Sequence, residues 1–81
     1  MIKAGDKIKT IGYFQGIEAI VEKVEKWEED GPPSIENHGT ITITITKITN
    51  PKTKMQWAIG IQEHFVYFDW QEHLQIIEES K

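Results

Sequence analysis

The sequence predicts an all-β fold of about five antiparallel strands in one domain, residues 1–81. The main observation is the segment 39–48, in which isoleucines alternate with threonines. A period of two with β-branched residues is typical of a strand that buries one face. Turn residues separate this segment from further apolar runs, and a chain of this length has room for only one small core.

The first expected strand is short and follows turn residues at Gly5-Asp6, with Ile8 and Thr10 pointing to one side. The strand at 39–48 is followed by Asn50-Pro51, which is turn chemistry, and by a second alternating segment at 55–61, so the two predict a hairpin. Two further strands are expected, in "HFVYF" and in "QII" near the end. The predicted core consists of Val21, Ile41, Ile43, Ile45, Trp57, Ile59 and Phe68.

Residues 17–29 are ambiguous between helix and strand. Their apolar residues recur at helical spacing and their polar residues are strong helix formers, which favours an amphipathic helix. As a strand, the segment puts Ala19 and Val21 on one face but Val24 on the other, so a single apolar face requires a bulge near Glu22-Lys23. Because the segment lies between two β segments, we expect a bent strand. The alternative is an α+β fold with a helix at 17–29 on an antiparallel sheet.

Two parts of the chain resemble a known family. The opening segments "AGDKIKT", "IGYFQG" and "IEAIVEKVE", and the later segment "VYFDWQEHLQII", resemble the beginning and the end of SH3-like small β-barrels, most closely the KOW-type and Tudor-like members. The resemblance implies an SH3-like barrel in which "DWQEHL" forms a 3₁₀ turn before the last strand, "QII". The chain lacks the basic, glycine-rich signature of KOW domains, and it lacks the acidic early loop and adjacent aromatics of peptide-binding SH3 domains.

Charge and composition restrict the function. The net charge is −4, and all nine cations are lysines, so the chain has no guanidinium forks and no overall basic footprint for duplex DNA. The absence of cysteine excludes a disulfide framework and thiolate chemistry. The first ten residues do not resemble a signal peptide, and no apolar run approaches the length of a membrane span. We therefore expect a soluble, cytoplasmic protein without a membrane partner.

The tripeptide Gln-Glu-His occurs twice, ending at His64 and His73. Metal-binding histidine pairs on one element are usually spaced i, i+4 on a helix or i, i+2 on a strand, so these two histidines reach a common metal only through the fold, with His38 as a third ligand and Glu63 and Glu72 as carboxylates. The favoured interpretation is that both tripeptides are polar residues flanking apolar segments. The sequence predicts no catalytic residue, no metal and no cofactor.

Eight aromatic residues are more than a small barrel buries completely. In SH3-like barrels the first loop lies beside the closing turn, and exposed aromatics grouped in this way are typical of a binding surface. The predicted partner-binding residues are Tyr13, Phe14, Tyr67 and Trp70, with Asp69 and Glu72 at the rim.

The predicted function is accordingly a small non-catalytic module that binds another protein of unknown identity; an adaptor, a regulator or a phage-type inhibitor of a host protein would each fit. The alternative is a KOW-like module that binds single-stranded nucleic acid through its aromatics and lysines. A metal-dependent enzyme that uses the histidines ranks third.

Overall fold

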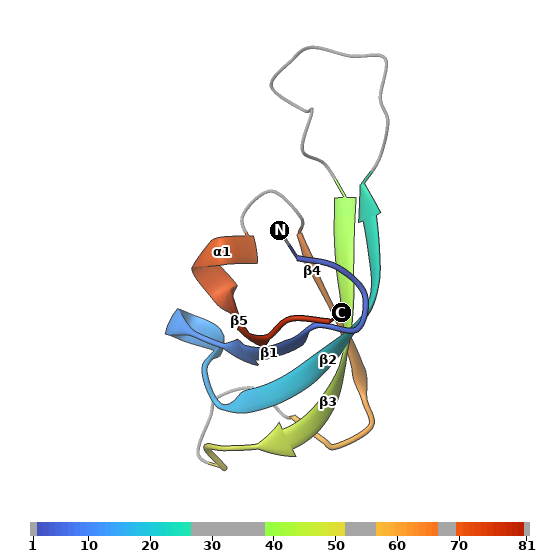
Figure 1. The fold of residues 1–81 in the computed structure, drawn as a ribbon. Helices are drawn as coiled ribbons and strands as arrows, with labels where there is room; N and C mark the ends of the chain where they lie inside the picture. The colour runs from blue at the N-terminus through green and yellow to red at the C-terminus, as the bar shows by residue number, and fades with distance from the viewer. Residues whose placement is uncertain (1, 27–38, 52–56, 67–69, 81) are drawn as a thin grey trace.

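The structure, a computed structural model, describes residues 2–26, 39–51, 57–66 and 70–80. In these residues the strands form one antiparallel sheet in the order β4-β3-β2-β1-β5 (Figure 1). The all-β prediction is therefore confirmed. The elements are β1 (Lys7–Thr10), a 3₁₀ turn η1 (Gly12–Phe14), β2 (Ile17–Lys26), β3 (Gly39–Ile48), β4 (Gln62–Val66), a single helical turn α1 (Trp70–His73) and β5 (Leu74–Glu78).

The ambiguous segment is a strand, so the helical alternative is wrong for its described part, residues 17–26. The pairing of β2 with β3 shifts between Val21, opposite Ile43, and Lys23, opposite Thr42. The extra residue is a β-bulge at the expected position. Ala19 and Val21 are buried before it, and Val24 packs against the same core after it, because the bulge moves the inward face from odd to even residues.

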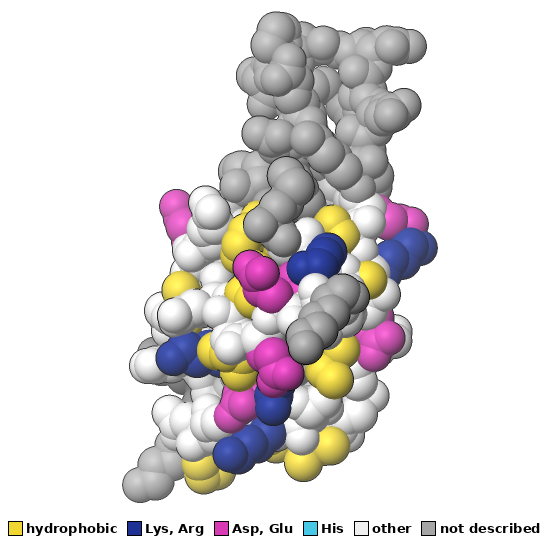
Figure 2. Space-filling model, viewed as in Figure 1, with side chains coloured by type: hydrophobic (Ala, Val, Ile, Leu, Met, Phe, Trp, Pro, Cys, Tyr) yellow, Lys and Arg dark blue, Asp and Glu magenta, His cyan; other side chains and the backbone are white. Residues whose placement is uncertain are grey.

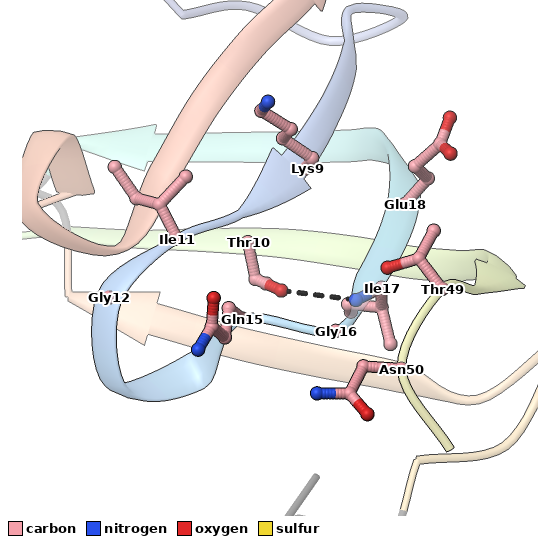
Figure 3. Close-up of a pocket in the computed structure, with 10 residues that line it drawn as sticks. All are labelled: Lys9, Thr10, Ile11, Gly12, Gln15, Gly16, Ile17, Glu18, Thr49 and Asn50. Atoms are coloured by element: carbon pink, nitrogen blue, oxygen red, sulfur yellow. Dashed lines mark hydrogen bonds between the residues drawn. The ribbon is translucent and has the colours of Figure 1, made fainter. Parts of the chain in front are cut away.

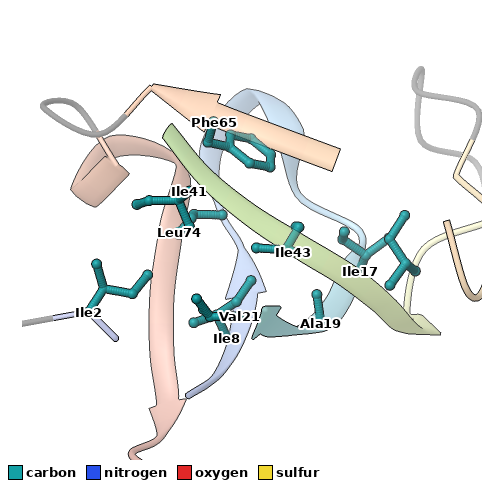
Figure 4. Close-up of a cluster of buried hydrophobic side chains, with 10 residues drawn as sticks. Ile2, Ile8, Ile17, Ala19, Val21, Ile41, Ile43, Phe65 and Leu74 are labelled. Atoms are coloured by element: carbon teal, nitrogen blue, oxygen red, sulfur yellow. The ribbon is translucent and has the colours of Figure 1, made fainter. Parts of the chain in front are cut away.

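The isoleucine face of β3 forms the centre of the core. Ile41, Ile43 and Ile45 are buried, whereas the threonines between them lie on the other face. Side chains from all five strands meet these isoleucines in one cluster (Figure 4). Ile8 and Thr10 are both buried, as the first expected strand requires. The buried hydrophobic residues are Ile2, Ile8, Ile17, Ala19, Val21, Ile41, Ile43, Ile45, Phe65 and Leu74.

The predicted hairpin partner of β3 is wrong in its described part. Residues 57–61 form no strand, and the strand that pairs with β3 on the side away from β2 is β4, with Ile43 opposite Glu63. The chain turns at Ile59 and Gly60, where Gly60 has a φ of +88°, a value that favours glycine. Ile59 is consequently 67% exposed and does not belong to the core. Trp57 packs against the core only in part, and the predicted core residue Phe68 lies outside the described residues.

The end of the chain matches the expected order of elements but not the expected type of turn. β5 confirms the predicted closing strand. The turn before it is α-helical, not 3₁₀, and the 3₁₀ turn lies in the first loop instead. An α-turn brings residues four apart to one side, so Trp70 and Leu74 both reach the core. In the described part of the chain, no helix has the length and hydropathy that crossing a bilayer requires.

Asp6 joins the two ends of the described chain. Its carboxylate is buried and accepts hydrogen bonds from the backbone N–H of Lys3 at 2.9 Å and of Ser80 at 2.7 Å. The Lys3 ammonium lies 3.2 Å from the same carboxylate. Burial raises the pKa of Asp6, but these hydrogen bonds and the ammonium outweigh it, so the pKa lies below its ordinary value. The carboxylate therefore fixes both ends beside β1.

Candidate functional site

The first loop lies against the closing turn, as the sequence predicts. The backbone N–H of Ile11 donates a hydrogen bond to the carbonyl of His73 at 2.8 Å. Gly12 follows with a φ of +62°, and a Cβ on it would lie 3.3 Å from the Glu72 carbonyl oxygen. Both the backbone conformation and the close approach favour glycine at this position. The loop thereby places η1, and with it Tyr13 and Phe14, beside α1.

Phe14 is the centre of an aromatic group drawn from three elements. Its ring centroid lies 5.6 Å from that of Phe65 on β4 and 4.9 Å from that of His73 on α1. Tyr13 lies 5.2 Å from it on the other side and is 70% exposed. All three ring pairs are close to perpendicular, the edge-to-face arrangement that aromatic quadrupoles favour.

These rings border a hollow of about 180 Å³. We name it the aromatic pocket; it is lined by Phe14, Trp57, Glu63, His64, Phe65, Val66 and His73. The indole Nε1–H of Trp57 is buried and has no hydrogen-bond acceptor in the part of the chain that the structure describes. A buried donor without an acceptor costs free energy.

Both repeated histidines line the aromatic pocket, so the fold does bring the two Gln-Glu-His tripeptides together. His64 Nδ1 lies 3.0 Å from Thr42 Oγ1, its neighbour across the β3–β4 pair, which fixes the ring. Within the described residues no three histidine or carboxylate side chains are placed to hold a metal ion, and His38 lies outside them. The histidines therefore contribute polar, aromatic edges to the pocket.

The predicted site residues divide into three groups. Tyr13 and Phe14 belong to the aromatic group; Phe14 lines the pocket, and Tyr13 contacts Phe14 without lining it. Glu72 is exposed on α1, and Trp70 packs partly against the core, so its side chain has a structural role. Tyr67 and Asp69 lie outside the described residues.

Sequence reasoning missed several residues that line the pocket. Trp57 was expected in the core, and the histidines were expected only to flank apolar segments. Phe65 was expected on the strand face opposite the core residue Phe68, which is wrong, because Phe65 is buried. The signal that would have found them is the register of β4 against β3, which places His64 beside Thr42 and Phe65 beside Ile41.

A second, larger hollow of about 410 Å³ lies on the other side of the first loop (Figure 3). Here the Thr10 hydroxyl accepts a hydrogen bond from Ile17 N–H at 3.3 Å, and the Gly16 carbonyl accepts one from Thr49 N–H at 2.7 Å. Its lining includes one cationic side chain, Lys9, and one anionic side chain, Glu18. Backbone turns form most of its wall, and the described lining contains no nucleophile with an adjacent base.

The charges around the site are mixed. On the face shown in Figure 2, lysine and acidic side chains are interspersed with hydrophobic ones. Glu18 lies between two lysines, 4.0 Å from Lys7 and 3.8 Å from Lys47. Among the described residues, Glu63 is the one carboxylate that lines the aromatic pocket, and no lysine lines it.

Comparisons of the chain with protein-family models, with curated proteins and with solved structures gave no significant match.

Proposed function

We propose that this protein is a small, non-catalytic module that binds another protein through the aromatic pocket and the adjacent Tyr13. The observation that carries the proposal is the aromatic group around Phe14, which borders an open hollow and leaves Tyr13 largely exposed. Aromatic rings provide large contact areas at a low cost in conformational entropy, and they dominate the binding energy of many interfaces.

We also propose that the sheet curls into an SH3-like barrel. The support is the order of the elements: a loop after β1 that meets the turn before β5, and a bulged β2 in the middle of the sheet. Bulges increase local twist and bend the strand, which is how small sheets curve toward closure.

The charges favour a protein partner over single-stranded nucleic acid. A nucleic-acid groove needs cations beside its stacking rings, because the phosphate backbone must be neutralised. Lys7 and Lys47 share the Glu18 carboxylate, and the described lining of the aromatic pocket carries a carboxylate and no lysine. Lys52 and Lys54 lie outside the described residues.

The proposal is tested by affinity capture from the native host, followed by calorimetry with the captured protein in recombinant form. Tyr13→Ala is expected to weaken binding at least about tenfold, the effect of a hot-spot residue. Ile59→Ala is the matched control, because Ile59 is also a large, exposed apolar residue but does not line the pocket. Equal effects of the two substitutions, or none from Tyr13→Ala, would place the binding surface elsewhere.

A further inference from the structure

β4 is an edge strand of the sheet. In the described part of the chain it pairs with β3 along one side and with no strand along the other. An edge strand presents backbone N–H and C=O groups that are available to another chain.

The hydrogen-bonding phase of the β3–β4 pair identifies these groups. Just beyond the paired residues, the N–H of Ile45 donates to the Ile61 carbonyl at 3.0 Å, so Ile45 directs its backbone toward the β4 side. Hydrogen-bonded positions alternate along an antiparallel pair, so Glu63 and Phe65 direct their backbone groups toward β3. The backbone groups directed outward, to the free edge, are those of Gln62, His64 and Val66.

The aromatic pocket borders β4, the edge strand. Four successive residues, 63–66, border it, although side chains of successive strand residues point to opposite faces of a sheet. A hollow that borders all four residues therefore reaches the backbone of β4. Trp57 lines the same hollow, while its buried Nε1–H has no acceptor among the described residues.

We propose that β4 accepts an extended, basic segment of another protein as an additional strand, with alternate side chains of that segment entering the aromatic pocket. Main-chain hydrogen bonds to Gln62, His64 and Val66 provide affinity, and the pocket provides choice of side chain. This inference rests on the proposed function, because it specifies how the protein partner binds.

The negative charge near the pocket favours a basic segment as the added strand. The pocket wall contains Glu63 and no described lysine, Glu72 is exposed on the neighbouring helical turn, and the whole chain carries −4. Lysine or arginine on the incoming segment complements this charge and can lie over the aromatic rings. A second copy of the chain would instead bring another Glu63 and a second net negative charge to the same edge.

The test begins with selection of random twelve-residue peptides displayed on phage against the wild-type protein. The selected peptides are expected to carry a positive net charge. Each is then synthesised with a single backbone N-methyl group at every position in turn, which removes one N–H donor at a time. Strand pairing predicts that affinity falls at least about tenfold at every second position and changes little between them.

Substitutions in the protein test the same edge by changing β4 instead of the peptide. His64→Pro removes an outward N–H, whereas His64→Ala keeps it, so the proline variant is expected to bind at least about fivefold more weakly than the alanine variant. Glu63→Lys is expected to weaken binding at least about tenfold, while Glu79→Lys makes the same charge change at an exposed residue outside the pocket and has little effect. Amide exchange at Gln62, His64 and Val66 is expected to slow when peptide binds.

Several results would overturn the proposal. They are a selection that returns no binder or only acidic peptides, an N-methyl scan without a period of two, or unchanged exchange at the three amides. Protection of these amides with rising concentration of the protein alone would assign the edge to a second copy instead. If His64→Pro fails to fold, the N-methyl scan decides, because it uses the unaltered protein. A captured partner that depends on Tyr13 but shows none of these edge effects leaves the proposed function in place and removes only the strand-addition inference.

Discussion

Truncation of Ile43 tests the assignment of the two faces of β3. The Ile43 side chain is completely buried, on a strand that is flanked by Val21 on β2 and Glu63 on β4. Ile43→Ala removes three carbon atoms, which is about 2.4 kcal/mol at about 0.8 kcal/mol for each buried methylene. The cavity left at the centre of the sheet adds a further cost, so the free energy of unfolding is expected to fall by about 3–4 kcal/mol, within the usual range.

The neighbouring threonine provides the control. Thr42 lies on the opposite face and its hydroxyl contacts His64 Nδ1 at 3.0 Å in an exposed position. Thr42→Ala is therefore expected to cost no more than about 1.5 kcal/mol, the net value of one hydrogen bond. Both costs are measured by urea denaturation, followed through tryptophan fluorescence and checked for an unchanged m-value. Ile43→Val, expected to cost about 0.5–1.5 kcal/mol, replaces the alanine variant if that variant does not fold. Equal costs at positions 42 and 43 would refute the face assignment.

Four further outcomes are expected. Asp6→Asn should lower the free energy of unfolding by about 1–3 kcal/mol, because an amide replaces one acceptor oxygen with a donor facing a backbone N–H. The pKa of Asp6 is lowered in the folded state, so the ionised carboxylate contributes fully to the free energy of unfolding above its ordinary pKa of 3.8. This contribution is lost as the pH falls through the folded-state pKa. Acid titrations of the free energy of unfolding should show the loss in the wild type and not in Asp6→Asn. Trp70→Ala should cost about 1–3 kcal/mol and Tyr13→Ala less than about 0.5 kcal/mol in the same denaturation assay, since Trp70 packs against the core and Tyr13 is exposed. Fluorescence anisotropy should detect no duplex DNA binding tighter than about 10⁻⁴–10⁻⁶ M at physiological salt, and submicromolar, salt-sensitive binding of DNA would make nucleic acid the leading partner class.

The sequence predicted those features that depend on local alternation. The strict exchange of isoleucine and threonine on β3 gives only one choice of inward face, and the structure buries that face. The bulge in β2 was also predictable, because its apolar residues cannot lie on one face without an extra residue. The segment before β4 was predicted wrongly because the alternation passes through Gly60 without a break. The positive φ of Gly60 belongs to a turn, from which, among the described residues, only Gly60 and Ile61 bond to Ile45 of β3.

The candidate site could not be predicted from local sequence patterns, because it is formed by long-range contacts. Phe14, Trp57 and His73 are far apart in the sequence, and they meet only because Ile11 pairs with His73 and β4 pairs with β3. The first-loop aromatics were predicted from the resemblance to small barrels, and this approach of loop to closing turn is observed. The role of β4 in the pocket was not predicted, because it depends on which strand of the sheet lies at its edge.

The composition of β4 bears on the proposed strand addition. Unpaired edges promote aggregation, and proteins usually protect them with lysine, proline, a bulge or an inward-pointing charge. Along β4 the outward backbone positions carry Gln62, His64 and Val66, with neither lysine nor proline, and the adjacent hollow is lined by aromatic rings. Glu63 is the one charged residue on the strand, and it lies at the pocket wall. Under the proposed strand addition, the Glu63 carboxylate disfavours an acidic copy of the same chain and favours a basic segment, so that one side chain provides both specificity and protection of the edge.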